Sequence, residues 1–250
     1  MPTFLAEIRD TLLPGRDSKD GPLPPLLVGM TLVTGLVDAY SYLVLGHVFV
    51  ANMTGNVVFL GFALAGAPGF SIGASAAAMA SFSAGALVGG SIARRAAADR
   101  GALFGSSTLI QVMLVGVAVV LAWLGGNHVT PGYRYGLIAM LALAMGLQNA
   151  AVRKLAVADL TTTVLTMTMT GLVADSSLVG GTGSKAGRRM VAVFAMFLGA
   201  LLGAALVIHS RAAITLSLRL VVLSAIAATT LIMARSGPAW ARGLTGSGVR

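Results

Sequence analysis

Residues Leu26–Leu45 read LLVGMTLVTGLVDAYSYLVL, and Asp38 is the single formally charged residue among them. A helix of about 20 predominantly apolar residues is long enough to cross the hydrocarbon core of a bilayer. The stretch belongs to a longer region, from Gly21 to Ala93, in which Asp38 is again the only formal charge. Because a water-soluble surface needs many more charged side chains, this region predicts membrane-spanning helices.

The composition of the whole chain agrees with that prediction. Only 10% of the 250 residues are charged and 56% are hydrophobic, with a mean hydropathy of +0.89, whereas a soluble domain has about 25% charged residues. These values exclude a soluble enzyme, a disordered chain and a disulfide scaffold. The chain has no cysteine, which also excludes thiol catalysis and cysteine-ligated zinc. The net charge of +9 comes from short basic clusters between apolar segments, as in membrane-protein loops, so we expect no nucleic-acid binding.

Eight apolar segments follow one another along the chain, which predicts an all-α, polytopic membrane helix bundle. They span residues 26–45, 48–64, 72–93, 103–124, 135–152, 160–179, 190–208 and 214–233. Two segments are atypical. The second is the shortest and contains the polar break Asn52–Asn56, while the sixth contains six threonines and Asp175.

The chain also contains an internal repeat. The sequence Gly-Leu-Val-Asp-Ala at 35–39 recurs as Gly-Leu-Gln-Asn-Ala at 146–150, and the glycine pair of 85–89 recurs at 199–203. Thr54 falls opposite Thr166 at nearly the same offset. We therefore predict two copies of a four-segment unit, at 26–125 and 135–234, between a polar cytosolic tail (1–25) and a flexible C-terminal tail (235–250).

The positions of the basic residues favour six crossings over eight. If all eight segments cross, 10 Lys and Arg lie on the inner side and 6 on the outer side. If the second and sixth segments enter the membrane and return on the same side, the counts become 14 and 2, as the positive-inside rule requires. This reading makes the repeats inverted and both termini cytoplasmic. Eight crossings with parallel repeats remain the alternative, in which Asn52–Asn56 is merely a polar kink.

Asp38 is the most informative polar residue. A carboxylate in mid-span costs about 2.5–3.5 kcal/mol on insertion scales, so it is expected to face the bundle interior. Its repeat equivalent is Asn149, which has the same shape but cannot ionise. Asp38 thus predicts either a proton or cation site, or a neutral carboxyl group that hydrogen-bonds a neighbouring helix.

The polar breaks are the second candidate site. Glycine lets the backbone leave the helix, while Thr and Asn satisfy the freed backbone groups. Half-helix N-termini at the breaks would direct their positive ends toward an anion, and a kink held by interhelical hydrogen bonds is the alternative. The expected substrate- or ion-binding residues are Asp38, Asn52, Thr54, Gly55, Asn56, Gln148, Asn149, Thr162 and Thr166.

Two glycine pairs predict close helix packing. Gly85 and Gly89 form one small-xxx-small face, and Gly199 and Gly203 form the other. Such faces let helix backbones approach one another within a membrane. They suit pairing of the two repeats, and they also suit a homodimer.

Known catalytic and metal-binding patterns are missing from the sequence. It contains neither a His-Glu-x-x-His zinc helix nor a Gly-x-Ser-x-Gly nucleophile turn. We therefore expect no enzymatic activity, no metal site and no cofactor.

Three motifs resemble those of the YoaK-type family of bacterial inner-membrane proteins, which bear a domain of unknown function. They are Gly-Leu-Val-Asp-Ala at 35–39, Val-Phe-Val-Ala-Asn-Met-Thr-Gly-Asn at 48–56 and Gly-Leu-Gln-Asn-Ala at 146–150. The resemblance extends from about Leu26 to about Met233, and the chain departs from it at Met167, where a glycine is expected. It implies a multi-pass protein of the inner membrane with a suspected transport role.

Together these features predict a transporter or channel for a small solute, with proton coupling through Asp38 as one form of it. The alternative is a membrane scaffold or accessory subunit that transports nothing. A hydrated path from Asp38 to the two polar breaks would distinguish them, because a scaffold would pack those residues dry.

Overall fold

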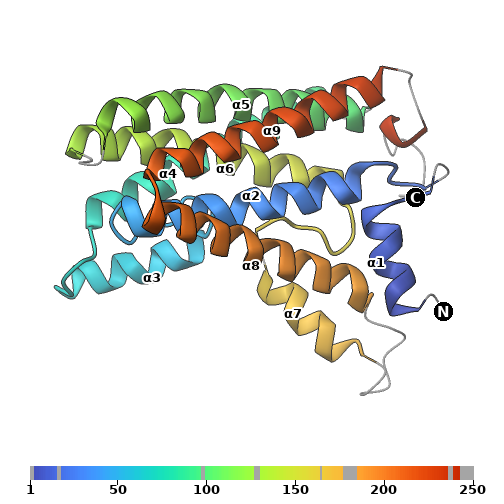
Figure 1. Cartoon of the computed structure of the whole chain (residues 1–250), viewed down its shortest axis with the longest axis horizontal. Helices are drawn as coiled ribbons and strands as arrows, with labels where there is room; N and C mark the ends of the chain where they lie inside the picture. Colours follow the sequence, from blue (N-terminus) through green and yellow to red (C-terminus); the bar gives the residue numbers. More distant parts are fainter. Residues whose placement is uncertain are drawn as a thin grey trace.

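The computed structural model describes residues 3–15, 18–96, 99–126, 130–163, 165–176, 185–235 and 239–242. These residues are mainly α-helical, and the β-type contact found among them is an isolated bridge between Asp99 and Arg242. Figure 1 shows a bundle of long helices that lie roughly along one axis.

Six helices of the described chain are long and apolar enough to cross a membrane. They are α2 (Leu23–Val44), α4 (Ile72–Arg95), α5 (Arg100–Gly125), α6 (Pro131–Leu155), α8 (Ala186–His209) and α9 (Ala212–Ala234). The shortest has 22 residues, and at 1.5 Å per residue it covers about 33 Å, slightly more than the hydrocarbon core. The predicted all-α membrane bundle is confirmed.

Two further apolar helices are only half as long. α3 (Met53–Leu64) has 12 residues and α7 (Leu165–Ala174) has 10, which correspond to about 18 Å and 15 Å. Neither can cross a bilayer alone, so the predicted six crossings with two broken segments hold and the eight-crossing alternative does not. Both diverge from the bundle, toward opposite ends of its long axis (Figure 1).

Side-chain contacts define the two ends of the bundle. At one end, which we call the basic end, the Arg100 guanidinium donates to Asp20 at 2.8 Å and to the Leu155 carbonyl at 3.2 Å. At the opposite end, Arg134 Nε donates to the Leu45 carbonyl at 2.7 Å. His47 Nδ1 lies 2.9 Å from the Gly69 carbonyl oxygen at that end. The chain therefore leaves α2 and enters α4 at the same end, with α3 between them.

The predicted packing glycines lie where long helices cross. A Cβ atom built on Gly85 of α4 would overlap the Leu143 carbonyl of α6, and one on Gly199 of α8 would overlap the Leu32 carbonyl of α2. Gly89 and Gly203 make the next contacts along the same two pairs, with a built Cβ 2.8 Å from Ala150 Cβ and from the Leu36 carbonyl oxygen respectively. Hydrogen is therefore the largest side chain that fits there.

These contacts are reciprocal. A Cβ atom on Gly146 of α6 would overlap the Phe82 carbonyl of α4, and one on Gly35 of α2 would overlap the Met196 carbonyl of α8. Each crossing thus has a glycine on both helices. Helix α2 packs on α8 and α6 packs on α4, so each pair joins one helix from each half of the chain.

The N-terminal segment is more ordered than a polar tail. Residues Phe4–Leu12 form helix α1, which the sequence analysis did not anticipate. The Glu7 carboxylate accepts a hydrogen bond from the Gly187 N–H at 2.9 Å, at the start of α8. At the other terminus, Ala239–Ala241 form the short helix η2, and residues 243–250 of the predicted tail lie outside the described residues.

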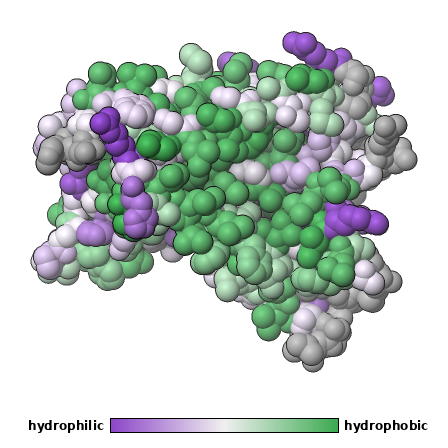
Figure 2. All heavy atoms as spheres, viewed as in Figure 1, coloured by the Kyte–Doolittle hydropathy of each residue, from purple (hydrophilic) through white to green (hydrophobic). Residues whose placement is uncertain are grey.

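Hydrophobic side chains dominate the middle of the surface drawn in Figure 2, while the strongly hydrophilic side chains gather toward the two ends. Many large apolar residues are exposed on the outer helix faces, among them Leu87, Met113 and Val221. Exposed apolar patches of this extent mark a surface that water does not solvate.

Candidate functional site

The chain between α2 and α3 is held in an extended form by Asn56. Its Nδ2 donates to the Phe49 carbonyl at 2.6 Å, and its Oδ1 accepts from the Phe49 N–H at 2.9 Å. Asn56 is fully buried, and so are Val48 and Val50 on either side of Phe49. The amide replaces the backbone partners that a helix would have supplied, and this allows an unwound segment to lie inside the protein.

Helix α3 begins directly after this segment. Asn52 is its N-cap, and its side-chain oxygen accepts from the Gly55 N–H at 3.2 Å, as short polar side chains do at helix starts. A Cβ atom on Gly55 would lie 2.7 Å from the Phe49 ring. Glycine is needed here because the aromatic ring occupies the place of a side chain.

Asp38 of α2 reaches this same turn. Its Oδ1 accepts from the Ala51 N–H at 3.1 Å, one residue before the N-cap of α3. Asp38 is half-buried. The carboxyl group thus links a long helix to the start of a half-length helix. The residue remains partly exposed.

Asn149 of α6 makes the corresponding contact near α7. Its Oδ1 accepts a hydrogen bond from the Thr163 hydroxyl, two residues before α7 begins. The sequence analysis predicts that Asp38 and Asn149 are equivalent positions of an internal repeat. Each is bonded to the chain that enters a half-length helix.

A cavity of about 640 Å³, which we call the central cavity, joins these elements. Six of the nine predicted site residues line it, namely Asp38, Asn52, Thr54, Gly55, Asn149 and Thr166. Phe59, Phe82 and Met196 contribute apolar walls. The cavity therefore offers a few polar groups on an apolar lining, as pockets for small molecules usually do.

The other three predicted residues do not line the central cavity. Asn56 clamps Phe49, as described above. Gln148 is fully buried, and its Nε2 donates to the Thr34 hydroxyl at 3.0 Å and to the Thr162 hydroxyl at 3.2 Å. Thr162 is 3% exposed and adopts a positive φ of 61°. These side chains shape the backbone beside the cavity.

A second pocket of about 850 Å³ adjoins the central cavity. The two share Phe82, Asn149 and Thr163 in their linings. The second pocket extends to the basic end, where Arg94, Arg153 and Lys154 border it. We call it the basic-end pocket.

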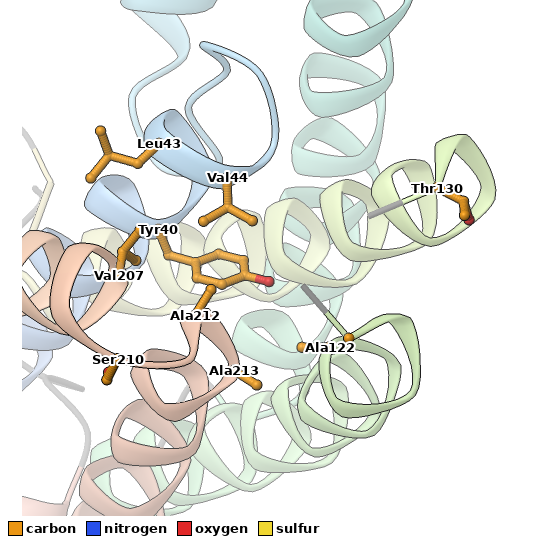
Figure 3. Close-up of a pocket in the computed structure, with 10 residues that line it drawn as sticks. Tyr40, Leu43, Val44, Ala122, Thr130, Val207, Ser210, Ala212 and Ala213 are labelled. Atoms are coloured by element: carbon orange, nitrogen blue, oxygen red, sulfur yellow. The ribbon is translucent and has the colours of Figure 1, made fainter. Parts of the chain in front are cut away.

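A third pocket, of about 580 Å³, lies at the opposite end and is drawn in Figure 3. The Tyr40 ring extends into it from α2, and Val207 of α8 and Ala212 and Ala213 of α9 also line it (Figure 3). We call it the far-end pocket. Openings thus exist toward both ends of the bundle.

The sequence analysis assigned no role to Arg219, which lies inside the last apolar segment. In the structure Arg219 is fully buried in α9, and its Nη2 lies 2.9 Å from the Met145 sulfur. The charge of Asp38 acts on it electrostatically, although the two form no hydrogen bond. The sequence did contain a signal for this burial, namely a basic residue in the middle of an apolar segment, since such residues normally face the protein interior.

Comparison with known proteins agrees with this architecture. Residues 26–230 match the family described as "Protein of unknown function (DUF1275)". The UPF0700 transmembrane protein YoaK of Bacillus subtilis (strain 168) is 33% identical over 158 residues, which are 61% of this chain and 66% of that protein, slightly under two thirds of its length. No solved structure matches the chain.

The family match covers most of the chain, including both half-length helices and all of the six spanning helices except the first residues of α2 and the last residues of α9. The resemblance inferred from the three sequence motifs is therefore confirmed. This multi-pass membrane protein belongs to the DUF1275 family of proteins of unknown function.

Proposed function

We propose that this protein is a transporter or channel for a small polar solute. The central cavity carries the proposal, because Asp38 and the first turns of both half-length helices line one and the same cavity of a membrane bundle. Unwound backbone at membrane depth is tolerated where it lines a cavity, and broken helices of this kind form solute sites in transporters. The proposal requires no chemical step and no cofactor.

The lining indicates the class of solute. Asn52 and Thr54 stand at the N-terminal end of α3, and Thr166 stands at the N-terminal end of α7. Both helix dipoles direct positive charge into the cavity, while Asp38 supplies an ionisable carboxyl group. A solute with hydrogen-bonding groups and a modest apolar part fits this combination.

The proposal includes an architecture in which the chain consists of two inverted copies of one structural unit. It is supported by the reciprocal glycine crossings, since Gly85 and Gly199 make equivalent contacts with the Leu143 and Leu32 carbonyls. It is also supported by α3 and α7, which start near the same cavity and run toward opposite ends (Figure 1). In transporters built from inverted repeats, the solute site lies between the repeats near the middle of the membrane.

We further propose that the basic end faces the cytoplasm of a bacterial inner membrane. Arg94, Arg153, Lys154 and Arg189 lie at or near this end, which suits the positive-inside rule. The basic-end pocket would then form the cytoplasmic vestibule, and Asn149 and Thr163 would separate it from the central cavity.

The absence of native cysteine makes a direct test simple. Single variants Thr54→Cys and Thr166→Cys are labelled in membranes with a charged, membrane-impermeant thiol reagent. Thr230→Cys is the matched control, because Thr230 is fully buried in α9 and bonds to the carbonyl of its own helix. A hydrated path predicts rapid labelling of both cavity positions and none at position 230.

A non-transporting scaffold predicts a different result. If the cavity residues are packed dry, then neither Thr54→Cys nor Thr166→Cys reacts, and the transport proposal fails. If they react, a thermal-shift screen of small polar solutes follows. Flux of the stabilising solute into proteoliposomes then separates a transporter from a receptor.

A further inference from the structure

The core between α5, α6 and α9 holds polar side chains that the central cavity does not use. Five of them are at most 1% exposed, namely Ser107, Gln111, Gln148, Thr215 and Arg219. Within the described chain, several of their polar atoms have no hydrogen-bond partner: Nε and Nη1 of Arg219, both amide atoms of Gln111, Oε1 of Gln148 and the hydroxyls of Ser107 and Thr215. Buried polar atoms are normally bonded, so this group requires an explanation.

Helix register places the largest of these side chains at one level of the bundle. Helices α5 and α6 are antiparallel, with Gly125 beside Tyr133 and Leu121 beside Gly136. This register places Gln111 at the level of the α6 turn that runs from Met145 to Gln148. The Arg219 guanidinium contacts the Met145 sulfur at 2.9 Å, so it lies at that same level.

The charge of Arg219 is poorly compensated. A guanidinium stays protonated in proteins, and a buried charge is normally paired and hydrogen-bonded. None of the salt bridges among the described residues includes Arg219, and the thioether of Met145 is a weak acceptor. Asp38 acts on Arg219 only through its charge. The Nε and Nη1 nitrogens therefore have no hydrogen-bond partner among the described residues, and the charge of Asp38 reaches Arg219 without a bond to either of them.

We propose that Arg219 and Gln111 bind a small monovalent inorganic anion, such as chloride, in the core between α5, α6 and α9. The guanidinium supplies charge-assisted donors, and the Gln111 amide and the Thr215 hydroxyl supply neutral ones. Water alone would satisfy the neutral groups but would leave the buried positive charge without a partner. The tight burial restricts the ligand to a monatomic or comparably small ion.

The far-end pocket lies at the start of the helix that carries Arg219. Ala212 and Ala213 border the pocket and begin helix α9. Thr215 and Arg219 follow on the same face of that helix, four residues apart. From Ala213 to Arg219 the helix rises about 9 Å, so Arg219 lies deeper along α9 than the residues that border the pocket.

The anion site stands apart from the proposed solute path, because the residues assigned to it do not line the central cavity. Binding is therefore measured on the resting, full-length protein without any transport assay. The two sites interact through Asp38, whose negative charge opposes an anion at Arg219. Removal of that charge is expected to strengthen anion binding.

The test uses purified full-length chain, titrated with sodium chloride against sodium gluconate at constant ionic strength. Melting temperature and isothermal calorimetry report binding. We expect saturable stabilisation by chloride and none by the bulky gluconate. Arg219→Gln weakens binding by about tenfold or more, because it removes a charged donor pair. Asp38→Asn tightens binding, and Arg95→Gln, the same charge change at an exposed position of the basic end, has no effect.

Gln111→Met keeps the result interpretable if Arg219→Gln fails to fold. It preserves volume and leaves the charge of the core unchanged, and it is expected to weaken chloride binding severalfold. The proposal is overturned if wild-type protein shows no saturable chloride effect. It is also overturned if folded Gln111→Met binds chloride as tightly as wild type. A flux assay that detects no transport, by contrast, tests the proposed solute path and not the anion site.

Discussion

Asp38 and Asn149 line the same cavity, and each accepts a hydrogen bond from the chain that leads into a half-length helix. The partner of Asp38 is the Ala51 N–H, and the partner of Asn149 is the Thr163 hydroxyl. The two positions are predicted to be equivalent in an internal repeat, and they differ in that only Asp38 can gain or lose a proton. The two contacts are therefore similar in position, and they differ in that one of the two acceptors is ionisable.

Substitutions at Asp38 separate its structural and functional roles. Asp38→Asn keeps an oxygen that accepts from the Ala51 N–H, so it is expected to fold normally and to abolish any pH dependence of solute flux. Asp38→Leu removes the acceptor and is expected to cost about 1–3 kcal/mol of stability. Flux as a function of pH and melting temperature are the two measurements. Full pH-dependent flux in Asp38→Asn would show that the residue is only a hydrogen-bonding group.

Topology reporters test the orientation of the bundle. Fusions after Arg95, Lys154, Arg189 and Arg242 are expected to report a cytoplasmic location, while those after Thr130 and Arg211 report a periplasmic one. The reason is the concentration of Lys and Arg in the first group of loops. A periplasmic signal after Arg95 together with a cytoplasmic one after Arg189 would contradict the proposed orientation.

Glycine substitutions test the two helix crossings. Gly85→Leu and Gly199→Leu force a side chain into a backbone carbonyl of the facing helix, and we expect a loss of about 1–3 kcal/mol or more and a lower folded yield. Gly116→Leu in α5 is the control, since a Cβ atom there meets nothing within 4 Å. Equal yields and melting temperatures for all three variants would mean that the crossings are looser than described.

Arg189 is expected to hold α7 against the bundle. Its Nε donates to Asp159 and its Nη1 donates to Asp175, each at 2.8 Å, so it bridges the two ends of the α7 segment. Arg189→Met should increase hydrogen exchange across 165–175, with a local loss of about 1–2 kcal/mol because Asp175 is half exposed. Most of the global stability should remain.

Arg188→Met is the matched control for that variant. The Arg188 hydrogen bonds, to Thr11 and to the Ala158 carbonyl, are long at 3.4 Å and do not reach α7. Its exchange across α7 should therefore equal that of the wild type. If Arg188→Met and Arg189→Met raise exchange equally, the salt bridges are not what positions α7.

Much of the architecture could be predicted from local properties of the chain. Hydropathy located eight apolar segments that include the six spans, and the Asn52–Asn56 break indicated where a segment becomes a half-length helix. The spacing of Gly85 and Gly89 indicated a helix-packing face. Each of these signals depends on neighbours within a few turns, so a single sequence carries it in full.

The helices and side chains that contact one another could not be predicted in this way. Only the folded chain shows that Gly85 packs on α6 and Gly199 on α2, that Gln148 bonds to Thr34 beside the cavity, and that Arg219 is fully buried. Its position against Met145 depends on three helices that are far apart in sequence. The composition and periodicity of the sequence determined that this protein is a membrane bundle with two broken segments. The tertiary structure decided which polar groups meet inside it, because contacts between helices arise from complementary shapes that no local pattern encodes.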